Sequence, residues 1–397
     1  MKKFFKSICS VVLATVLITG IVFSMFSIQT LASNGEGVIT LDVVWEDVSF
    51  TYDVGTATWN PLNHNYETDG SSAEWTDGVG KITVINYSSV SMLVDIAFKV
   101  AENPNGTAVL TVDKPSFVLQ RGDLTAQESA PRDFTTVSAS GVPKDGSSLG
   151  KITVTVSMNE NAYEREENTV YFGEYPQTLK ASSVTVGTTA DSRGYFLGSD
   201  NEYYAKVTAS PYESGYKFST DAAVTSGSVY YFKVEPLKWR ILSENNGNAL
   251  LICESIIANG RYDDASNDYG ASEIRAWLNG QFYNTAFDNI EKSFIESVTL
   301  ENGLTDNVYL PSFAEASTLN QELRVKNVSD YARASGAWVS TSYLTAQNGN
   351  GLWMLRTPNG TYSHFIGECN HIGDLSDGGT NLASKFYGIV PALTIKL

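Results

Sequence analysis

Residues 271–287 have the sequence ASEIRAWLNGQFYNTAF, the segment that constrains the fold most strongly. Its apolar residues recur at the spacing of one helix face, at Ile274, Trp277, Leu278 and Phe282. Ser272 stands just before them, where a hydroxyl accepts hydrogen bonds from the free N–H groups of a first helical turn. The segment therefore predicts an amphipathic helix at 272–283. It contains no nucleophile, general base or group of metal ligands, so it indicates a domain type rather than a reaction.

The sequence on both sides of this helix predicts a domain of mixed α and β structure. Upstream, apolar residues alternate through 229–253 around Asn246-Gly247, a dipeptide that favours the tight turn of a β-hairpin. From residue 348 onward the chain is rich in Gly and Asn, which predicts long loops between short strands. Two pairs downstream of the helix have the spacing of a capping box, namely Asp288 with Glu291 and Ser312 with Glu315.

The first half of the chain has a different pattern, in which apolar and polar residues alternate throughout 33–160. Alternation with a period of two is typical of strands that bury one face. Because no helical pattern interrupts these strands, we expect an antiparallel β-sandwich of immunoglobulin-like type. Residues 161–169 are polar and charged and are predicted to be a linker. The expected fold class is mostly β, with an α+β second half at 170–397. The alternation is clearest at Met92, Val94 and Ile96 and at Ile152, Val154 and Val156.

The N-terminus has the three parts of an export signal. Lys2, Lys3 and Lys6 are followed by an uncharged apolar run from Ile8 to Phe26 and by small residues that end at Ala32. We therefore expect residues 1–32 to be a signal peptide cleaved after Ala32, and the protein to be secreted or attached to the cell surface. The apolar run covers 19 positions, just enough to cross a bilayer, so an uncleaved membrane anchor is the alternative.

The chain is acidic, with a formal net charge of −17 over 397 residues. Cleavage after residue 32 would make the mature protein more acidic, because the signal contains lysines and no acid. Such a surface repels phosphate backbones, and no run of Lys or Arg offers an exception, so nucleic acid is not an expected partner. The length favours two domains.

Six blocks of the second half resemble a family of exported bacterial domains of unknown function. The resemblance covers 170–397 and implies a C-type-lectin-like fold, shared in outline with formylglycine-generating enzymes. In that fold, helices pack on a small antiparallel sheet and long loops form a variable binding surface. The resemblance also implies that inserted strands occupy about 179–228, and it carries no assigned chemistry. The blocks are YFGEYPQT at 171–178, YFKVEPLKWRIL at 231–242, the segment 271–287, LPSFAEA at 310–316, WMLRTP at 353–358 and GIVPAL at 388–393.

The closing block departs from this family at one position. Members often have an Arg where Val390 stands in this chain. If that Arg holds a buried acid or a ligand in the family, this chain does without it.

The loop-rich end of the chain contains the candidates for ligand binding. Aromatic rings stack on sugars, and Arg offers a planar hydrogen-bonding fork. His364, Glu368, His371 and Asp374 also have the composition of a zinc site. The alternative is that they are ordinary polar residues of a loop. The ligand-binding candidates are Arg356, Tyr362, His364, His371 and Asp374.

An acidic loop before the helix is the candidate for a cofactor site. Asp263, Asp264 and Asp268 supply oxygen ligands at a density that suits Ca²⁺. A solvated acidic loop is the alternative, and no other cofactor is expected.

The two cysteines outside the signal, Cys253 and Cys369, leave two alternatives open. They form a disulfide in an exported protein, or they are two buried thiols. Cys369 and His371 are two positions apart, a spacing at which residues of one strand share a face, which suggests a thiol enzyme. The 116 positions between the cysteines do not match the closely spaced pair of formylglycine-generating enzymes.

These observations favour an exported, non-enzymatic binding or adhesion protein. In this hypothesis the β-sandwich presents the lectin-like domain to a glycan or protein ligand outside the cell. The alternatives are an enzyme on a formylglycine-generating-enzyme-like scaffold and a structural component of the cell surface.

Overall fold

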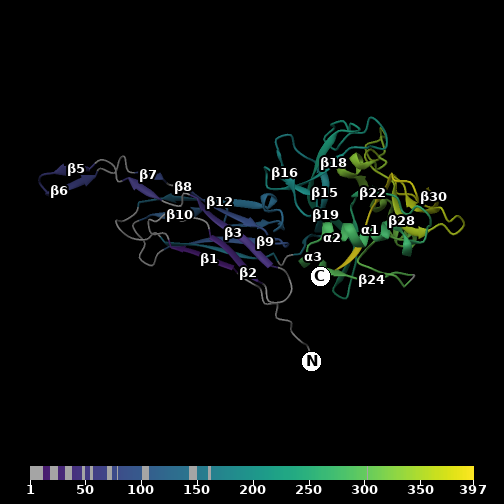
Figure 1. Cartoon of the computed structure of the whole chain (residues 1–397), viewed down its shortest axis with the longest axis horizontal. Helices are drawn as coiled ribbons and strands as arrows, with labels where there is room; N and C mark the ends of the chain where they lie inside the picture. The colour runs from purple at the N-terminus through teal and green to yellow at the C-terminus, as the bar shows by residue number, and fades with distance from the viewer. Residues whose placement is uncertain are drawn as a thin grey trace, which may run out of the picture. The chain divides into compact units, whose positions relative to one another are not determined.

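The computed structural model describes residues 12–17, 26–31, 38–46, 50–53, 57–68, 74–77, 79–100, 107–142, 150–159, 162–301 and 303–397. The chain forms two compact units, Met1–Asn159 and Glu160–Leu397 (Figure 1). The boundary falls where the sequence pattern changes. The named elements of the first unit are strands and one short turn of 3₁₀ helix, Gln127–Ser129, whereas the second unit mixes strands with short helices. The mostly β fold class with a more helical second half is confirmed.

Two larger antiparallel sheets form the body of the first unit. One has the strand order β1-β13-β9-β11 and the other β10-β12-β8-β3-β2. Two hairpins stand apart from them, β4 (Thr51–Asp53) with β7 (Glu74–Asp77) and β5 (Ala57–Asn60) with β6 (Asn65–Thr68). The sheet strands are β1 (Val12–Leu17), β2 (Phe26–Leu31), β3 (Val38–Glu46), β8 (Val79–Asn86), β9 (Met92–Val100), β10 (Val109–Val112), β11 (Ser116–Leu119), β12 (Arg132–Ser140) and β13 (Gly150–Met158).

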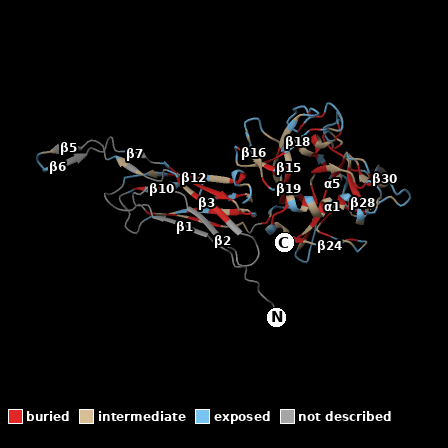
Figure 2. Ribbon diagram, viewed as in Figure 1, coloured by how far each residue is buried: buried red, intermediate tan, exposed pale blue. Residues whose placement is uncertain are grey.

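Burial alternates along β9 and β13, the two central strands of the four-stranded sheet, as the period of two predicts. In β9, Met92, Val94 and Ile96 are buried while Asp95 and Ala97 between them are exposed. In β13 the buried residues likewise alternate with half-buried ones. Figure 2 shows the buried residues following the strands of this unit. The four-stranded sheet therefore has one apolar face to bury, which agrees with the antiparallel β structure expected for residues 33–160.

Two edge strands of the first unit come from the predicted export signal. β1 pairs with β13 and β2 pairs with β3, both antiparallel. Cleavage after Ala32 would remove both strands and leave β13 and β3 at the sheet edges. Lys2, Lys3, Lys6 and Ala32 lie outside the described residues. No helix of the described residues is long and apolar enough to cross a membrane.

The predicted linker at 161–169 is wrong for the part that the structure describes. β14 (Glu164–Glu166) pairs with the start of β15 (Thr169–Leu179), so these residues form the first hairpin of the second unit. β14 has a single partner strand and is exposed, and Arg165 forms an ion pair of 2.5 Å with Glu244. An exposed edge strand has the same charged composition as a linker, which explains the wrong prediction.

A ten-stranded sheet forms the larger part of the second unit, with the main order β16-β17-β18-β19-β20-β32-β23. β14, β15 and β26 attach to this path. The predicted hairpin at 229–253 is confirmed as β19 and β20, and Asn246 and Gly247 in its turn have φ of 51° and 80°. The remaining strands of this sheet are β16 (Val186–Ala190), β17 (Tyr195–Gly198), β18 (Tyr203–Thr208), β19 (Val229–Asn245), β20 (Asn248–Cys253), β23 (Ile295–Glu296), β26 (Val308–Tyr309) and β32 (Ala392–Lys396).

The segment 179–228, which we call the insert, adds strands to one edge of this sheet. β16, β17 and β18 lie within it, and β18 pairs with β19. The rest of the insert folds into a small hairpin closed by a bridge between Lys217 and Ala223. Three strands are therefore present in the segment where the resemblance implied inserted ones.

The helical segment predicted at 272–283 is present and runs further. It consists of α1 (Glu273–Trp277), a π-helical turn (Leu278–Phe282) and α2 (Tyr283–Ala286). Ser272 caps it by accepting a hydrogen bond from the backbone N–H of Arg275. Both predicted capping boxes form, at the starts of α3 (Asn289–Phe294) and α4 (Phe313–Ser317). The π-helical turn was not predicted. Within it, the side-chain amide of Asn279 donates a hydrogen bond to the carbonyl of Val308 in β26 and accepts one from the N–H of the same residue.

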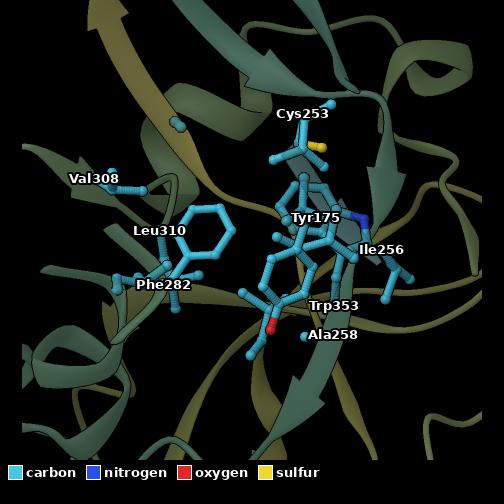
Figure 3. Packing of buried hydrophobic residues seen from close by; sticks show 14 of the residues in the cluster. Tyr175, Cys253, Ile256, Ala258, Phe282, Val308, Leu310 and Trp353 are labelled. Carbon is cyan, nitrogen blue, oxygen red and sulfur yellow. The ribbon is translucent and has the colours of Figure 1, made fainter. Parts of the chain in front are cut away.

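A second sheet contains the loop-rich end of the unit, with the order β22-β31-β28-β29-β30. Trp239 and Trp353 are both 0% exposed, and Figure 3 shows Trp353 packed near Cys253 and Tyr175. Val390 is also 0% exposed, so the position where the resembled family often has Arg lies in the core here. The elements not yet given are β21 (Ser255–Ile256), β22 (Ala258–Gly260), β24 (Val298–Thr299), β25 (Thr305–Asp306), β27 (Asn327–Val328), β28 (Trp353–Pro358), β29 (Phe365–Cys369), β30 (Leu375–Asn381), β31 (Tyr387–Ile389), α5 (Gln321–Arg324) and α6 (Asp330–Ser335).

Candidate functional site

Arg356 is an internal ion-pair partner, which corrects its prediction as a ligand-binding residue. Its side chain is 5% exposed, and its guanidinium forms ion pairs of 2.7 Å with Glu301 and 2.6 Å with Glu315. It also donates a hydrogen bond of 2.7 Å to the carbonyl of Leu310. Burial opposes the charge, but the hydrogen bonds to Glu315 and Glu301 outweigh it and raise the pKa of Arg356. The planar fork is therefore already occupied.

Tyr362 and His364 lie on the surface, in the turn that leads into β29. Tyr362 is 55% exposed. The centroid of the His364 ring lies 5.9 Å from that of Tyr362 and 4.2 Å from that of Phe365. Asn267 holds this turn by donating hydrogen bonds to the carbonyls of Tyr362 and Phe365. The two predicted residues thus form an exposed aromatic group, which remains a candidate contact surface.

His371 and Asp374 belong to the turn between β29 and β30, where their side chains have other partners. The imidazole of His371 packs on Trp338 with 5.4 Å between centroids, and Asp374 accepts a hydrogen bond of 2.9 Å from Gln321. Among the described residues no three His, Cys, Asp or Glu side chains are placed to hold a metal ion together. The zinc-like set containing His364, Glu368, His371 and Asp374 is therefore not assembled.

Each of the three calcium candidates also has its own local partners. Asp263 is 9% exposed and accepts hydrogen bonds from the backbone N–H groups of Ala265, Ser266 and Glu273. These bonds lower the pKa of Asp263 against the opposing effect of its desolvation. Asp268 caps the turn before α1, and Asp264 has an exposed side chain 3.8 Å from Arg261. The acidic residues thus stabilise the helix entry and do not converge on one cation.

Cys253 and Cys369 are free, buried thiols in the structure, the second of the two alternatives that the sequence left open. The Sγ of Cys253 lies 3.7 Å from the carbonyl of Lys238, and that of Cys369 lies 3.7 Å from the carbonyl of Arg324. Burial raises the pKa of Cys253 to about 11 and that of Cys369 to about 12. Neither group is the accessible thiolate that nucleophilic catalysis requires.

We predict that iodoacetamide at pH 8 leaves both thiols largely unmodified in the folded protein. Mass spectrometry of the Cys253 and Cys369 peptides measures the modified fraction of each residue separately. Full modification of both residues after unfolding in urea is the matched control. Rapid labelling of either residue in the native protein, or a peptide pair joined by a disulfide, would contradict the structure.

A cleft that the sequence did not predict lies between the insert and the loop after α6. Its volume is about 510 Å³, within the range of about 300–1,000 Å³ typical of small-molecule sites. One wall is the insert hairpin at 215–221, and the other contains Arg333 and residues between Val339 and Gly349. We call this space the insert cleft. Tyr343 lines it and is 93% exposed, so an aromatic ring stands at its rim.

Hydrogen bonds join the two walls of the insert cleft. The backbone N–H of Val339 donates to the hydroxyl of Tyr216 at 3.1 Å. Asp330, at the start of α6, accepts bonds of 2.7 Å from the N–H and the hydroxyl of Ser219. Tyr216 and Phe218 are both 2% exposed and anchor the insert hairpin in the core. The walls are therefore held in place before any ligand arrives.

Arg333 is a half-buried cation in the wall of the insert cleft. Its Nε donates to the carbonyl of Val328 and its Nη1 to the carbonyl of Lys217, both at 2.9 Å. Burial lowers the pKa of Arg333, and the nearby charge of Asp330 compensates only in part. Among the described residues Arg333 forms no ion pair, unlike Arg356 with Glu315. Its guanidinium is thus held by carbonyls, with the charge of Asp330 nearby but not in an ion pair.

One comparison with known proteins identifies part of this unit. Residues 246–397 match the family described as Domain of unknown function (DUF6273). A search of curated proteins and a search of solved structures each return no match. The family match contains Arg333 and the wall at 339–349, but it begins at residue 246, after the insert wall at 215–221. The insert cleft thus combines a family segment with one that the family match does not cover.

Sequence reasoning missed this cleft because its two walls are distant in the chain. Tyr216 and Val339 are separated by 123 positions, and no local pattern links them. The one available signal was the polar loop around Asn348-Gly349 with Tyr343 before it. That loop was expected to be irregular, but its partner was unknown.

Proposed function

We propose that the protein is an exported, non-enzymatic binding protein whose second unit holds a glycan in the insert cleft. The observation that carries the proposal is the exposed ring of Tyr343 beside hydrogen-bonding groups in one cleft. A sugar has apolar C–H faces that lie on an aromatic ring and a rim of hydroxyls that need donors and acceptors. Thr341, Thr345 and Asn348 line the same cleft and supply such groups.

A C-type-lectin-like fold for the second unit is part of this proposal. Two features support it: the helical stretch that begins at Glu273, which packs beside an antiparallel sheet, and the long, mostly exposed loop at 341–348. The burial and raised pKa of Cys369 count against the thiol enzyme that the neighbouring His371 suggested. Export itself rests on the Lys-rich start, the apolar run and the small residues before position 33.

A glycan array with the full-length chain and two tyrosine variants tests the proposal. Tyr343→Ala removes the ring at the rim of the insert cleft, and we expect it to weaken binding about 10-fold or more, as loss of an aromatic contact at a binding site does. Tyr362→Ala is the matched control, since it removes an exposed tyrosine outside the cleft. Binding of no glycan by the parent chain would end the proposal. Loss with Tyr362→Ala alone would move the site to the turn before β29.

A further inference from the structure

The insert cleft is far less acidic than the chain as a whole. The protein has a net charge of −17, yet the cleft contains Arg333 and Lys217 against one acidic lining residue, Asp221. Lys217 and Asp221 are 4.0 Å apart with side chains 63% and 93% exposed, a surface pair of little energy. The other nearby acid, Asp330, is 2% exposed, and both of its oxygens already accept hydrogen bonds. With Asp330 counted, two cations face two carboxylates, so the cleft is close to neutral in a strongly acidic protein and repels an anion less than the rest of the surface does.

Gly349 lies beside one edge of Arg333, next to the side-chain oxygen of Asn327, and adds no side chain there. A Cβ added at Gly349 would stand 2.9 Å from Nη2 of Arg333, too close for a side chain to be accommodated. Gly349 also has a φ of 85°, which favours glycine. Since Nε and Nη1 of Arg333 donate to carbonyls, Nη2 is the edge of the guanidinium left for a ligand. Arg333 lines the same cleft as Tyr343.

We infer that the insert cleft recognises an acidic saccharide, with a sugar carboxylate on the Nη2 edge of Arg333 and a sugar ring on Tyr343. This inference rests on the proposed glycan-binding function and specifies its ligand class. Arg is suited to this task because it donates charge-assisted hydrogen bonds in a fixed planar geometry. Lys217, at the rim, attracts the anion without fixing its orientation.

An array of oligosaccharide pairs that differ only in a carboxylate tests the inference. One pair compares galacturonate oligomers with galactose oligomers, and the other compares glucuronate-terminated with glucose-terminated chains. We expect the full-length protein to bind acidic members and to leave their neutral partners unbound. Arg333→Gln should weaken binding of an acidic member about 30-fold or more, since it removes one partner of a desolvated charge pair. Lys217→Gln should weaken it a few-fold and reduce the dependence of affinity on salt. Lys206→Gln is the matched control, because it removes one exposed lysine outside the cleft.

Each outcome of this experiment has a distinct meaning. Equal binding of acidic and neutral partners overturns the acidic ligand but leaves glycan binding in place. Selective binding that neither Arg333→Gln nor Lys217→Gln weakens overturns the site. Binding of no glycan overturns the proposed function itself. If Arg333→Gln fails to fold, the comparison of paired sugars with the parent chain and the salt dependence of Lys217→Gln decide the question.

Discussion

Replacing Arg356 with Met lowers the free energy of unfolding of the second unit by about 3 kcal/mol, the size expected when one partner of a buried ion pair is removed. The substitution keeps most of the side-chain volume and removes the charge. Glu315 and Glu301 then lose their common cation, and the carbonyl of Leu310 loses its donor. We place the effect at the lower end of the range because the side chains of Glu315 and Glu301 are 38% and 54% exposed and regain some water.

Urea unfolding followed by tryptophan fluorescence measures this effect. Arg261→Met is the matched control, because it makes the same substitution in a pair whose side chains are 35% and 44% exposed. We expect the control to lose far less stability than Arg356→Met, because exposed ion pairs contribute little. Equal losses for the two variants would show that Arg356 is no more than a surface ion pair and would reopen its assignment as a ligand contact.

The parts of the fold that the sequence predicts are those fixed by neighbours in the chain. Ser272 caps its helix, Asp288 and Glu291 form their box, and Asn246-Gly247 turns its hairpin through contacts a few residues long. Each of these sequence signals contains both interacting groups, so the local sequence is enough to predict the contact.

The predictions that failed depended on where a side chain lies in the tertiary structure. Arg356 follows an apolar run near the loop-rich end, but β28 is the third of five strands in its sheet and Arg356 is buried there. Its acidic partners come from positions 41 and 55 residues away, which no local pattern connects. Cys253 and Cys369 were compatible with a disulfide by compartment, but each packs with its own carbonyl partner. Composition shows what a residue is able to do, and the packing decides which of those roles it takes.

Asp330→Ala is expected to cost about 3 kcal/mol of stability and to abolish ligand binding in the insert cleft. The carboxylate of Asp330 accepts two hydrogen bonds from Ser219 and one of 3.1 Å from the backbone N–H of Leu179. Leu179 begins the insert and Ser219 lies in its wall of the cleft, so one buried anion fixes the insert at two points. Alanine leaves two backbone N–H groups without their acceptor, and the wall loses its position relative to α6.

Hydrogen exchange and glycan affinity, measured on the same samples, separate this role from a general loss of stability. We expect exchange at 215–221 to accelerate in Asp330→Ala far more than exchange in β19 and β20. Ser219→Ala is the matched control: it removes one of the three hydrogen bonds and keeps the carboxylate, so it should cost about 1 kcal/mol and retain most of the affinity. Uniform acceleration across the second unit, or full affinity in Asp330→Ala, would show that the position of the insert does not depend on this carboxylate. A selective effect would mean that the specificity of the cleft depends on how firmly the insert is attached to the segment matched by the family.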